Sequence, residues 1–183
     1  AARELNVDVM EVISAAATKP YGFMPFYPGA GVGGHCIPCD PHYLLWHLRS
    51  RRASSPVVEA AMTSVAARPR DVVARAQRVL ADSGRPLRCA RILVVGVAYK
   101  PGVADVRESP ALAIIDMLIA EGAHVAYTDP HVEVLHTPAA GSLFHLPQAA
   151  DEQWDLVVVH TLHPAEDYGW LAGQPSVLDT TYR

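Results

Sequence analysis

The chain is short of the features that mark several specialised classes of protein. Its 183 residues include only three cysteines, and 19% of them are charged, with a net charge of −4. Without an excess of basic residues there is no electrostatic footprint for nucleic acid. Three cysteines make a poor disulfide framework and are typical of a reducing compartment, so we expect a cytoplasmic location.

The sequence also has no long apolar run of the kind that spans a bilayer, so we expect no membrane partner. Its first residues have no continuous apolar core and do not resemble a signal peptide. The chain begins without methionine and inside a helical pattern, from which we expect a fragment of a longer protein. A hydrophobic content of 50% is ordinary for a globular protein.

Glycine and proline are instead concentrated in one stretch, residues 25–41. Proline fixes φ and glycine frees it, so the sequence predicts a shaped loop over about 20–41. Cys36 closes the glycine run and Asp40 follows four residues later. We interpret Cys36 as a nucleophile with a carboxylate neighbour; a small buried hydrophobic residue is the competing interpretation.

Two other interpretations of this loop fail on context. Residues 29–34 match G-x-G-x-x-G, but prolines precede them, whereas a dinucleotide fingerprint follows a strand and opens a helix. Cys36 and Cys39 form C-x-x-C with histidines nearby, but a zinc site usually needs a second pair of ligands, and Cys89 is alone. We therefore expect no metal here.

The first 84 residues predict a helical segment that carries this loop. Apolar residues at helical spacing predict a helix over 3–18, and another begins at Pro41. Residues 54–56 mark a break, residues 57–67 are helical, and Pro69 opens or kinks a further helix to about Ala81.

From residue 85 to 183 the pattern changes to an α/β domain. Strands are predicted at 91–97, 124–130, 154–160 and 176–179, with a helix over 110–121 capped by Ser109 and a mixed stretch at 131–153. This order predicts a doubly wound, Rossmann-like parallel sheet, with a domain boundary near residue 84.

Charged residues follow the strands of this predicted sheet. Lys100 and Arg107 lie after the first strand and before a helix N-terminus, which suits a phosphate or diphosphate, although a solvated loop is an equal alternative. Asp129 ends the second strand, where it binds a ribose or simply forms an Asp-Pro turn. The remaining histidines are scattered, and we interpret them as surface or satisfied core residues: His47, His124, His131, His136, His145, His160 and His163.

Two long motifs resemble the UDP-glucose/GDP-mannose dehydrogenase family, in the family's order. Residues 19–44 are similar to its catalytic-cysteine segment, and residues 96–112 to the start of its C-terminal UDP-sugar-binding domain. The form Gly33-Gly34-His35-Cys36-Ile37-Pro38 is closest to members that oxidise UDP-N-acetylhexosamines. UDP-glucose enzymes more often carry lysine where Cys39 stands.

The resemblance implies a double, NAD-linked oxidation of a sugar C6 alcohol to a carboxylate, for polysaccharide biosynthesis. It implies that Cys36 forms a thiohemiacetal and then a thioester, while Asp40 handles water and protons. It assigns Lys100 to the UDP-sugar and Arg107 to NAD, and implies a homodimer through the central helices. The residues that it assigns to the sugar are Pro25, Phe26, Tyr27, Pro28, Gly29 and Gly33.

Some of the family's features are not in this sequence. The NAD-binding Rossmann domain and the catalytic lysine and asparagine upstream of the cysteine are missing, so we expect no turnover by this chain alone. Residues 61–69 lack the usual asparagine and Met-Pro, and Thr181 stands where arginine is usual. Three hypotheses remain: a fragment of a UDP-N-acetylhexosamine 6-dehydrogenase, a fragment of a UDP-glucose 6-dehydrogenase, or a catalytically silent nucleotide-sugar-binding or assembly module.

Overall fold

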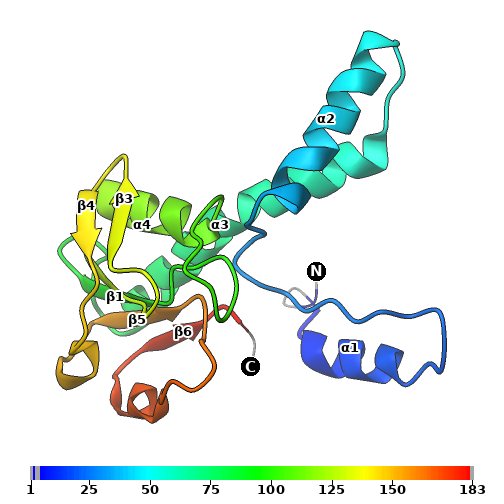
Figure 1. The fold of residues 1–183 in the computed structure, drawn as a ribbon. Helices are drawn as coiled ribbons and strands as arrows, with labels where there is room; N and C mark the ends of the chain where they lie inside the picture. Colours follow the sequence, from blue (N-terminus) through cyan, green and yellow to red (C-terminus); the bar gives the residue numbers. More distant parts are fainter. Residues whose placement is uncertain (1, 3–4, 182–183) are drawn as a thin grey trace.

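The computed structural model describes residue 2 and residues 5–181, in which three helices precede an α/β unit (Figure 1). The helices are α1 (Val9–Ala17), α2 (Cys36–Ser50) and α3 (Pro56–Asp82). Figure 1 shows α1, α2 and the first half of α3 projecting away from the sheet that follows.

Local capping and proline chemistry explain where the first two helices begin. Asp8 accepts a hydrogen bond from the Met10 amide at 2.8 Å and starts α1, later than the predicted residue 3, which lies outside the described residues. Helix α2 begins at Cys36, so the expectation of a loop reaching residue 41 was wrong. Pro38 is in the first turn, where no amide donor is needed, and Pro41 is tolerated inside the helix.

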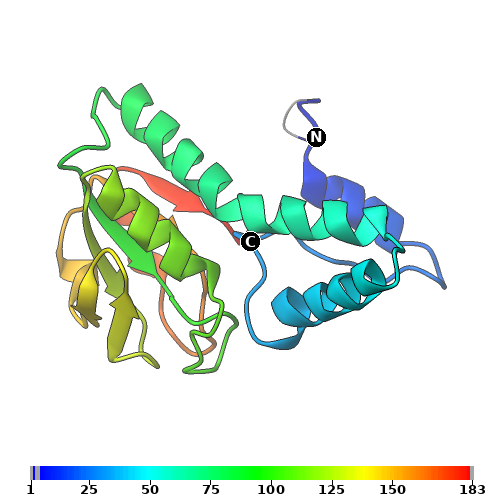
Figure 2. The ribbon, with the colours of Figure 1, turned by 90° about the horizontal axis from the view of Figure 1, so that it is seen from above.

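Helix α3 runs without a break through Pro69. Proline lacks the amide that would bond one turn back, so a change of direction is expected there. Figure 2 shows the helix changing direction part-way along its length, which agrees with the kink and not with a new helix. Beyond Pro69, the buried residues Val72, Val73, Ala76 and Leu80 face the sheet.

The α/β unit is built on a parallel sheet, as the sequence predicted, and the strands of this sheet lie in the order β2-β1-β5-β6. The strands are β1 (Arg91–Val95), β2 (His124–Thr128), β5 (Leu156–Val159) and β6 (Val177–Asp179). Helix α4 (Pro110–Ala120) joins β1 to β2 and begins at the predicted cap, Ser109, whose side chain accepts from the Ala111 amide. Helices α3 and α4 cover the same face of the sheet (Figure 1).

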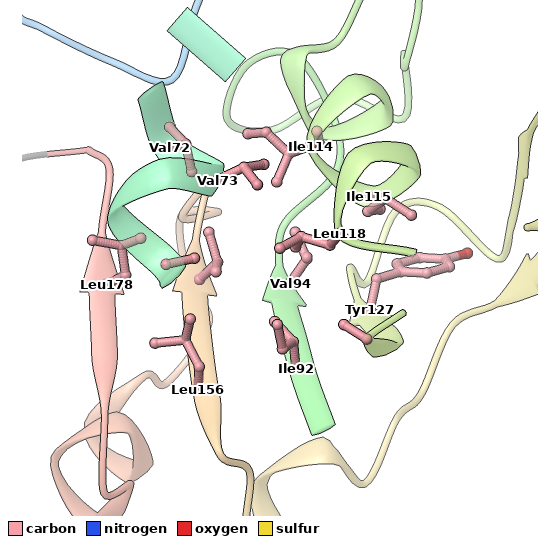
Figure 3. Close-up of a cluster of buried hydrophobic side chains, with 14 of the residues drawn as sticks. Val72, Val73, Ile92, Val94, Ile114, Ile115, Leu118, Tyr127, Leu156 and Leu178 are labelled. Carbon is pink, nitrogen blue, oxygen red and sulfur yellow. The ribbon is translucent and has the colours of Figure 1, made fainter. Parts of the chain in front are cut away.

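Alternation along the strands divides the core between the two faces. Ile92, Val94, Leu156 and Val158 pack under α3 and α4 (Figure 3), where Tyr127 completes the cluster. The opposite face carries Leu93, Val95, Val157 and Val159. It is covered by Trp154 and residues of the short 3₁₀ helices η1 (Ala149–Asp151) and η2 (Gly169–Gly173), instead of the α-helices that a doubly wound sheet would have.

The stretch that the sequence left as mixed contains an antiparallel hairpin, β3 (Val134–Thr137) and β4 (Gly141–Phe144). Its turn is the three residues Pro138-Ala139-Ala140, which carry no two-residue hairpin signal. Among residue 2 and residues 5–181, no helix combines the length and apolar character needed to cross a membrane.

Candidate functional site

A pocket of about 230 Å³ opens where the parallel strands end. One wall is the glycine-rich loop, and the other is formed by segments that follow β1, β5 and β6. In open α/β sheets, ligands bind at this carboxyl edge. The lining residues are Tyr27, Pro28, Gly29, Ala30, Gly31, Tyr99, Lys100, Pro101, Pro110, His160, Thr161, Leu162, Thr180 and Thr181.

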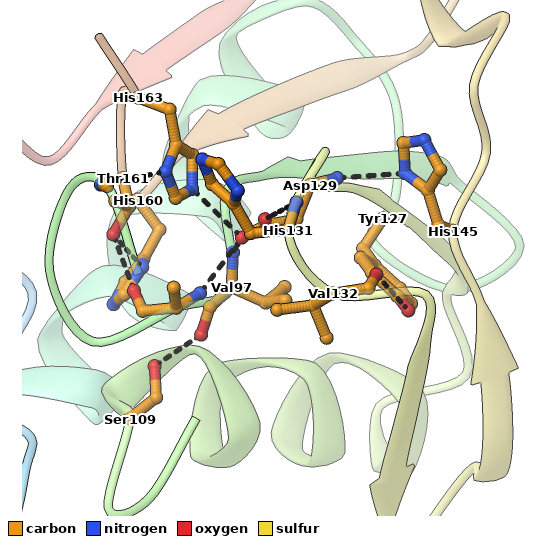
Figure 4. A network of polar contacts seen from close by, with 12 residues as sticks. Val97, Ser109, Tyr127, Asp129, His131, Val132, His145, His160, Thr161 and His163 are labelled. Carbon is orange, nitrogen blue, oxygen red and sulfur yellow. Dashed lines mark hydrogen bonds and ion pairs between the residues drawn. The ribbon is translucent and has the colours of Figure 1, made fainter. Parts of the chain in front are cut away.

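The turn that carries Lys100 is held at its backbone by buried side chains from other elements (Figure 4). Ser109 Oγ donates to the Val97 carbonyl at 2.7 Å, and Thr161 Oγ1 donates to the Ala98 carbonyl at 2.8 Å. The amides of Val97 and Ala98 both donate to Asp129 Oδ2, at 2.7 and 3.0 Å. The turn is therefore fixed before any ligand arrives.

Asp129 is fully buried and pairs with the equally buried His163 at 3.1 Å. The Gly102 amide donates to His163 Nδ1, so the ring proton is on Nε2 and points to the carboxylate. Burial would raise the pKa of Asp129, but hydrogen bonds from the Ala98, Val97 and His131 amides, with His163, outweigh it and lower the pKa. The Asp129 carboxylate therefore stabilises the loop after β1 from inside the protein, and because it is buried it does not face a ribose.

The opposite wall lies against the α/β unit along a seam of glycines. A Cβ atom at Gly33 would meet Tyr99 Cβ at 2.6 Å and the Glu108 carbonyl at 2.9 Å. One at Gly31 would meet the Pro110 ring at 2.9 Å, and the Gly34 amide donates to the Arg107 carbonyl at 2.9 Å. The glycines of the G-x-G-x-x-G match therefore allow close packing between two parts of the chain. This packing explains why glycine stands at these positions without any role in binding a phosphate.

His160 is half-buried in the pocket wall beside Lys100. Burial lowers its pKa to about 4, against smaller opposing effects of the Gly96 backbone and Asp129, so the ring is neutral near pH 7. The interpretation of this histidine from the sequence, as a surface or core residue, missed its place in the pocket wall. The position could have been recognised, because His160 ends one predicted strand and Thr161 follows it, at the edge of the sheet where ligands bind; Thr180 and Thr181 likewise follow another predicted strand.

The structure brings part of the predicted site together in this pocket. Tyr27, Pro28, Gly29 and Lys100 all line it, while Gly33 lies in the seam behind it. The other predicted residues lie outside the lining: Pro25, Phe26, Cys36, Asp40 and Arg107.

Cys36 and Asp40 are both exposed, in the first two turns of α2. Four residues apart on a helix, their side chains share one face. Arg107 belongs to the α/β unit and pairs with Asp105 there: its guanidinium donates to both carboxylate oxygens of Asp105, which lowers the pKa of Asp105 to about 2. Asp105 in turn raises the pKa of Arg107, and Cys36 is near enough to add a smaller effect of the same sign.

The described residues form no complete binding site for a metal ion or for a dinucleotide. Within residue 2 and residues 5–181, no group of three or more His, Cys, Asp or Glu side chains is placed to hold a metal ion. A dinucleotide would bring its pyrophosphate to the amides after β1. The Asp129 carboxylate already occupies the Val97 and Ala98 amides, so this loop does not fit NAD.

Two profiles of one protein family match the chain. The central domain of the UDP-glucose/GDP-mannose dehydrogenase family matches residues 1–65, and its UDP binding domain matches residues 93–181. The chain belongs to this family. The sequence resemblance is thereby confirmed, and the pocket lies between segments of the two matched regions.

Curated relatives of the family are similar over most of the chain. A UDP-N-acetyl-D-mannosamine dehydrogenase of Campylobacter jejuni is 31% identical over 87% of this chain and 38% of the relative. An NDP-N-acetyl-D-galactosaminuronic acid dehydrogenase of Ralstonia nicotianae is 30% identical over 87% of this chain and 36% of the relative. The chain therefore spans less than half the length of these relatives.

Solved structures of the family share the fold. A UDP-D-ManNAc dehydrogenase of Pyrococcus horikoshii superposes with a TM-score of 0.81 at 27% identity, over 98% of this chain and 42% of the other. A UDP-glucose dehydrogenase of Pyrobaculum islandicum gives 0.76, also at 27% identity, over 98% of this chain and 41% of the other. Both substrate types thus occur among structures that resemble this one.

Proposed function

We propose that this chain provides the reactive thiol and the UDP-sugar pocket of an NAD-dependent UDP-N-acetylhexosamine 6-dehydrogenase. The observation that carries the proposal is the pocket in which the glycine-rich loop before Cys36 meets the turn of Lys100. These are the two motifs of the family resemblance, residues 19–44 and 96–112, and 51 residues of sequence separate them. The N-acetylhexosamine is favoured by the Gly-Gly-His-Cys-Ile-Pro form and by Cys39; UDP-glucose is the alternative substrate.

Charge and shape in the pocket suit a nucleoside diphosphate sugar. Lys100 brings a cation to the edge of the pocket, where a diphosphate needs one. The other polar lining groups are neutral: the His160 ring, the hydroxyls of Thr161 and Thr180, and loop amides. Tyr27 and Pro28 give a flat apolar surface on the loop side, which suits a sugar ring or a base.

Cys36 supplies the covalent part of the reaction. Its sulfur adds to the carbonyl carbon of the C6 aldehyde, and the carbonyl oxygen takes a proton to give a thiohemiacetal. Oxidation of that carbon gives a thioester, water then adds, and the carbon–sulfur bond breaks to release the carboxylate and the thiol. Asp40, one turn along the same helix face, is placed to accept the proton of the attacking water.

NAD is the cofactor that membership in the family implies, and two molecules of NAD would each accept one hydride in the overall double oxidation. Because the loop after β1 does not fit it, we assign this chain only one contact with NAD, at Arg107. We also propose that the chain divides into a helical segment of residues 1–84 and a UDP-sugar domain of residues 85–183, and that it forms a homodimer through the helices of the first segment. We propose a cytoplasmic location, which suits the three free thiols.

Calorimetric titration of the chain with UDP, UDP-N-acetylglucosamine, UDP-N-acetylmannosamine and UDP-glucose tests the proposal. We expect an N-acetylhexosamine ligand to bind more tightly than UDP-glucose, and Lys100→Met to weaken all of them. Binding of none of the four would contradict the proposed pocket, and tighter binding of UDP-glucose would favour the alternative substrate.

A labelling experiment separates the enzyme part from a silent binding module. Cys36 and Cys89 are both exposed, so iodoacetamide reaches both thiols. If Cys36 lies beside the bound sugar, saturating UDP-N-acetylhexosamine slows alkylation of Cys36 and leaves Cys89 unchanged. Equal labelling of Cys36 with and without ligand, in a chain that binds the ligand, would favour the silent module.

A further inference from the structure

Arg68 reaches from α3 to the backbone of the pocket loop. Its Nε and Nη2 atoms both donate to the Gly29 carbonyl oxygen, at 3.1 and 2.9 Å. The remaining Nη1 atom donates to Asp71 Oδ2 at 3.3 Å, one turn along the helix, which holds the guanidinium plane in place. Arg68 itself does not line the pocket, whereas Gly29 does.

The two ends of this contact differ in how firmly they are held. Residues 23–29 form no helix or strand, so the loop has no ladder of backbone bonds to fix it. Arg68 immediately precedes the buried Pro69, and Val72 and Val73 on the next turn pack into the core of the sheet. The guanidinium therefore connects an irregular wall of the pocket to the part of α3 that packs into the core.

We propose that Arg68 is a positioning residue that sets the loop wall of the pocket, residues 27–31, at the distance from Lys100 that the substrate requires. The identity of the ligand in this inference rests on the proposed function. The positioning of the loop rests only on the contact between Arg68 and Gly29. Two donors on one planar, charged group fix both the direction and the distance of the carbonyl. A lysine could donate once and without that fixed plane.

The glycine seam does not make this contact redundant. The seam holds residues 31–34 against Tyr99, Glu108 and Pro110, which is the far end of the loop. Arg68 holds the loop at Gly29, the middle of the segment that lines the pocket. Apart from the contact with Arg68, residues 23–29 have no hydrogen bond to α3 or to the α/β unit among the described residues.

Hydrogen exchange of the ligand-free chain tests the mechanics. In Arg68→Ala we expect the amides of Ala30 and Gly34, the buried residues of the 29–34 segment, to exchange about tenfold faster, since a charge-assisted pair of hydrogen bonds is lost. Arg68→Lys should fall between the variant and the parent. Arg70→Ala, which removes an exposed arginine two residues away on the same helix, is the matched control and should change nothing. Unchanged exchange in Arg68→Ala would overturn the proposal.

Titration with UDP and with a UDP-N-acetylhexosamine tests the consequence for the pocket. We expect Arg68→Ala to lose affinity for the UDP-sugar by about tenfold while its affinity for UDP changes much less, with partial rescue in Arg68→Lys. An equal loss for both ligands, or no loss, would overturn the positioning role. If the parent chain binds neither ligand, the proposed function fails, and the exchange experiment still decides whether Arg68 holds the loop.

Discussion

The helices at the start of this chain expose their apolar side chains, whereas the α/β unit buries its own. Helix α1 has no buried residue and α2 buries only Leu45, whereas α4, of similar length, buries five of its eleven residues. Almost all the large exposed hydrophobic side chains lie before residue 58, among them Phe26, Ile37 and Trp46; beyond it there are only Val134, Phe144 and Val177 in the described residues.

The difference indicates which part depends on its own core. The sheet with α4 and the second half of α3 buries residues on both of its faces, so its stability is internal. The exposed apolar face of the earlier helices gains stability only when another surface covers it, at about 25 cal/mol per Å². The proposed homodimer through these helices would supply such a surface.

Truncating one side chain in each part is the strongest way to break this comparison. Leu118 is fully buried between α4 and the sheet, so Leu118→Ala should lower the free energy of unfolding by about 2–5 kcal/mol. Trp46 is 71% exposed, and Trp46→Ala should change it by less than about 0.5 kcal/mol. Denaturant titration at low protein concentration measures both; a comparable loss at Trp46 would show that α2 has a core of its own.

Acid should destabilise the α/β part through His160. Above its ordinary pKa of 6.5 the ring is neutral whether the chain is folded or unfolded. Below 6.5 the unfolded chain takes up a proton, and the folded chain resists until about pH 4, so stability falls over this window. At about 1.4 kcal/mol per pKa unit the loss reaches about 3 kcal/mol as an upper limit, because the side chain is only partly shielded.

The pH dependence of unfolding checks this assignment. His160→Gln should flatten the slope between pH 6.5 and 4, whereas His124→Gln, at an exposed position, should leave it as in the parent. Asp129, whose pKa is lowered, contributes stability that is lost mainly as the pH falls below the ordinary carboxyl value of 3.8, and this contribution is common to the parent and the variant, so it does not mask the difference between them. A slope that His160→Gln leaves unchanged would refute the role of this histidine.

The sequence predicted the α/β part better than the site. Continuous β-branched runs such as Ile92–Val95 and the Ser109 cap are local signals, and they gave the parallel strands and α4. The start of α2 at Cys36 was missed because two prolines were weighted as helix breakers, although one lies in a first turn. The predicted boundary near residue 84 stays a prediction; α3 itself contributes to the core of the sheet.

The site was harder to predict because its walls depend on contacts distant in sequence. Lys100 and the loop were each recognised from a motif, but the pairing of Arg68 with Gly29 joins positions 39 residues apart. Burial of Asp129 beneath the loop that follows β1 is likewise not visible in the local sequence, since an Asp-Pro at a strand end also suits a turn. No single-sequence pattern distinguishes these outcomes.

Adding a side chain in the glycine seam should lower stability less than the truncation of Leu118 does. Gly33→Ala would place a methyl group 2.6 Å from Tyr99 Cβ and 2.9 Å from a backbone oxygen, which forces the loop away. We expect a loss of about 1–3 kcal/mol in the free energy of unfolding. Gly173→Ala is the control, because nothing lies within 4 Å of the added atom. Equal effects of the two substitutions would mean that the loop does not dock on Tyr99.

The smallest effect is expected at the ion pair that joins α2 to α3. Arg49 Nη2 lies 3.2 Å from Glu59 Oε1, but the two side chains are 69% and 38% exposed, so water and salt screen the attraction. Arg49→Ala should therefore cost less than about 0.5 kcal/mol, and even that difference should vanish in 1 M salt. Thermal unfolding at low and high salt measures it. A larger, salt-resistant loss would mean that α2 is held to α3 by packing through the stem of Arg49, and that the exposed part of the molecule is less dependent on a partner than its surface indicates.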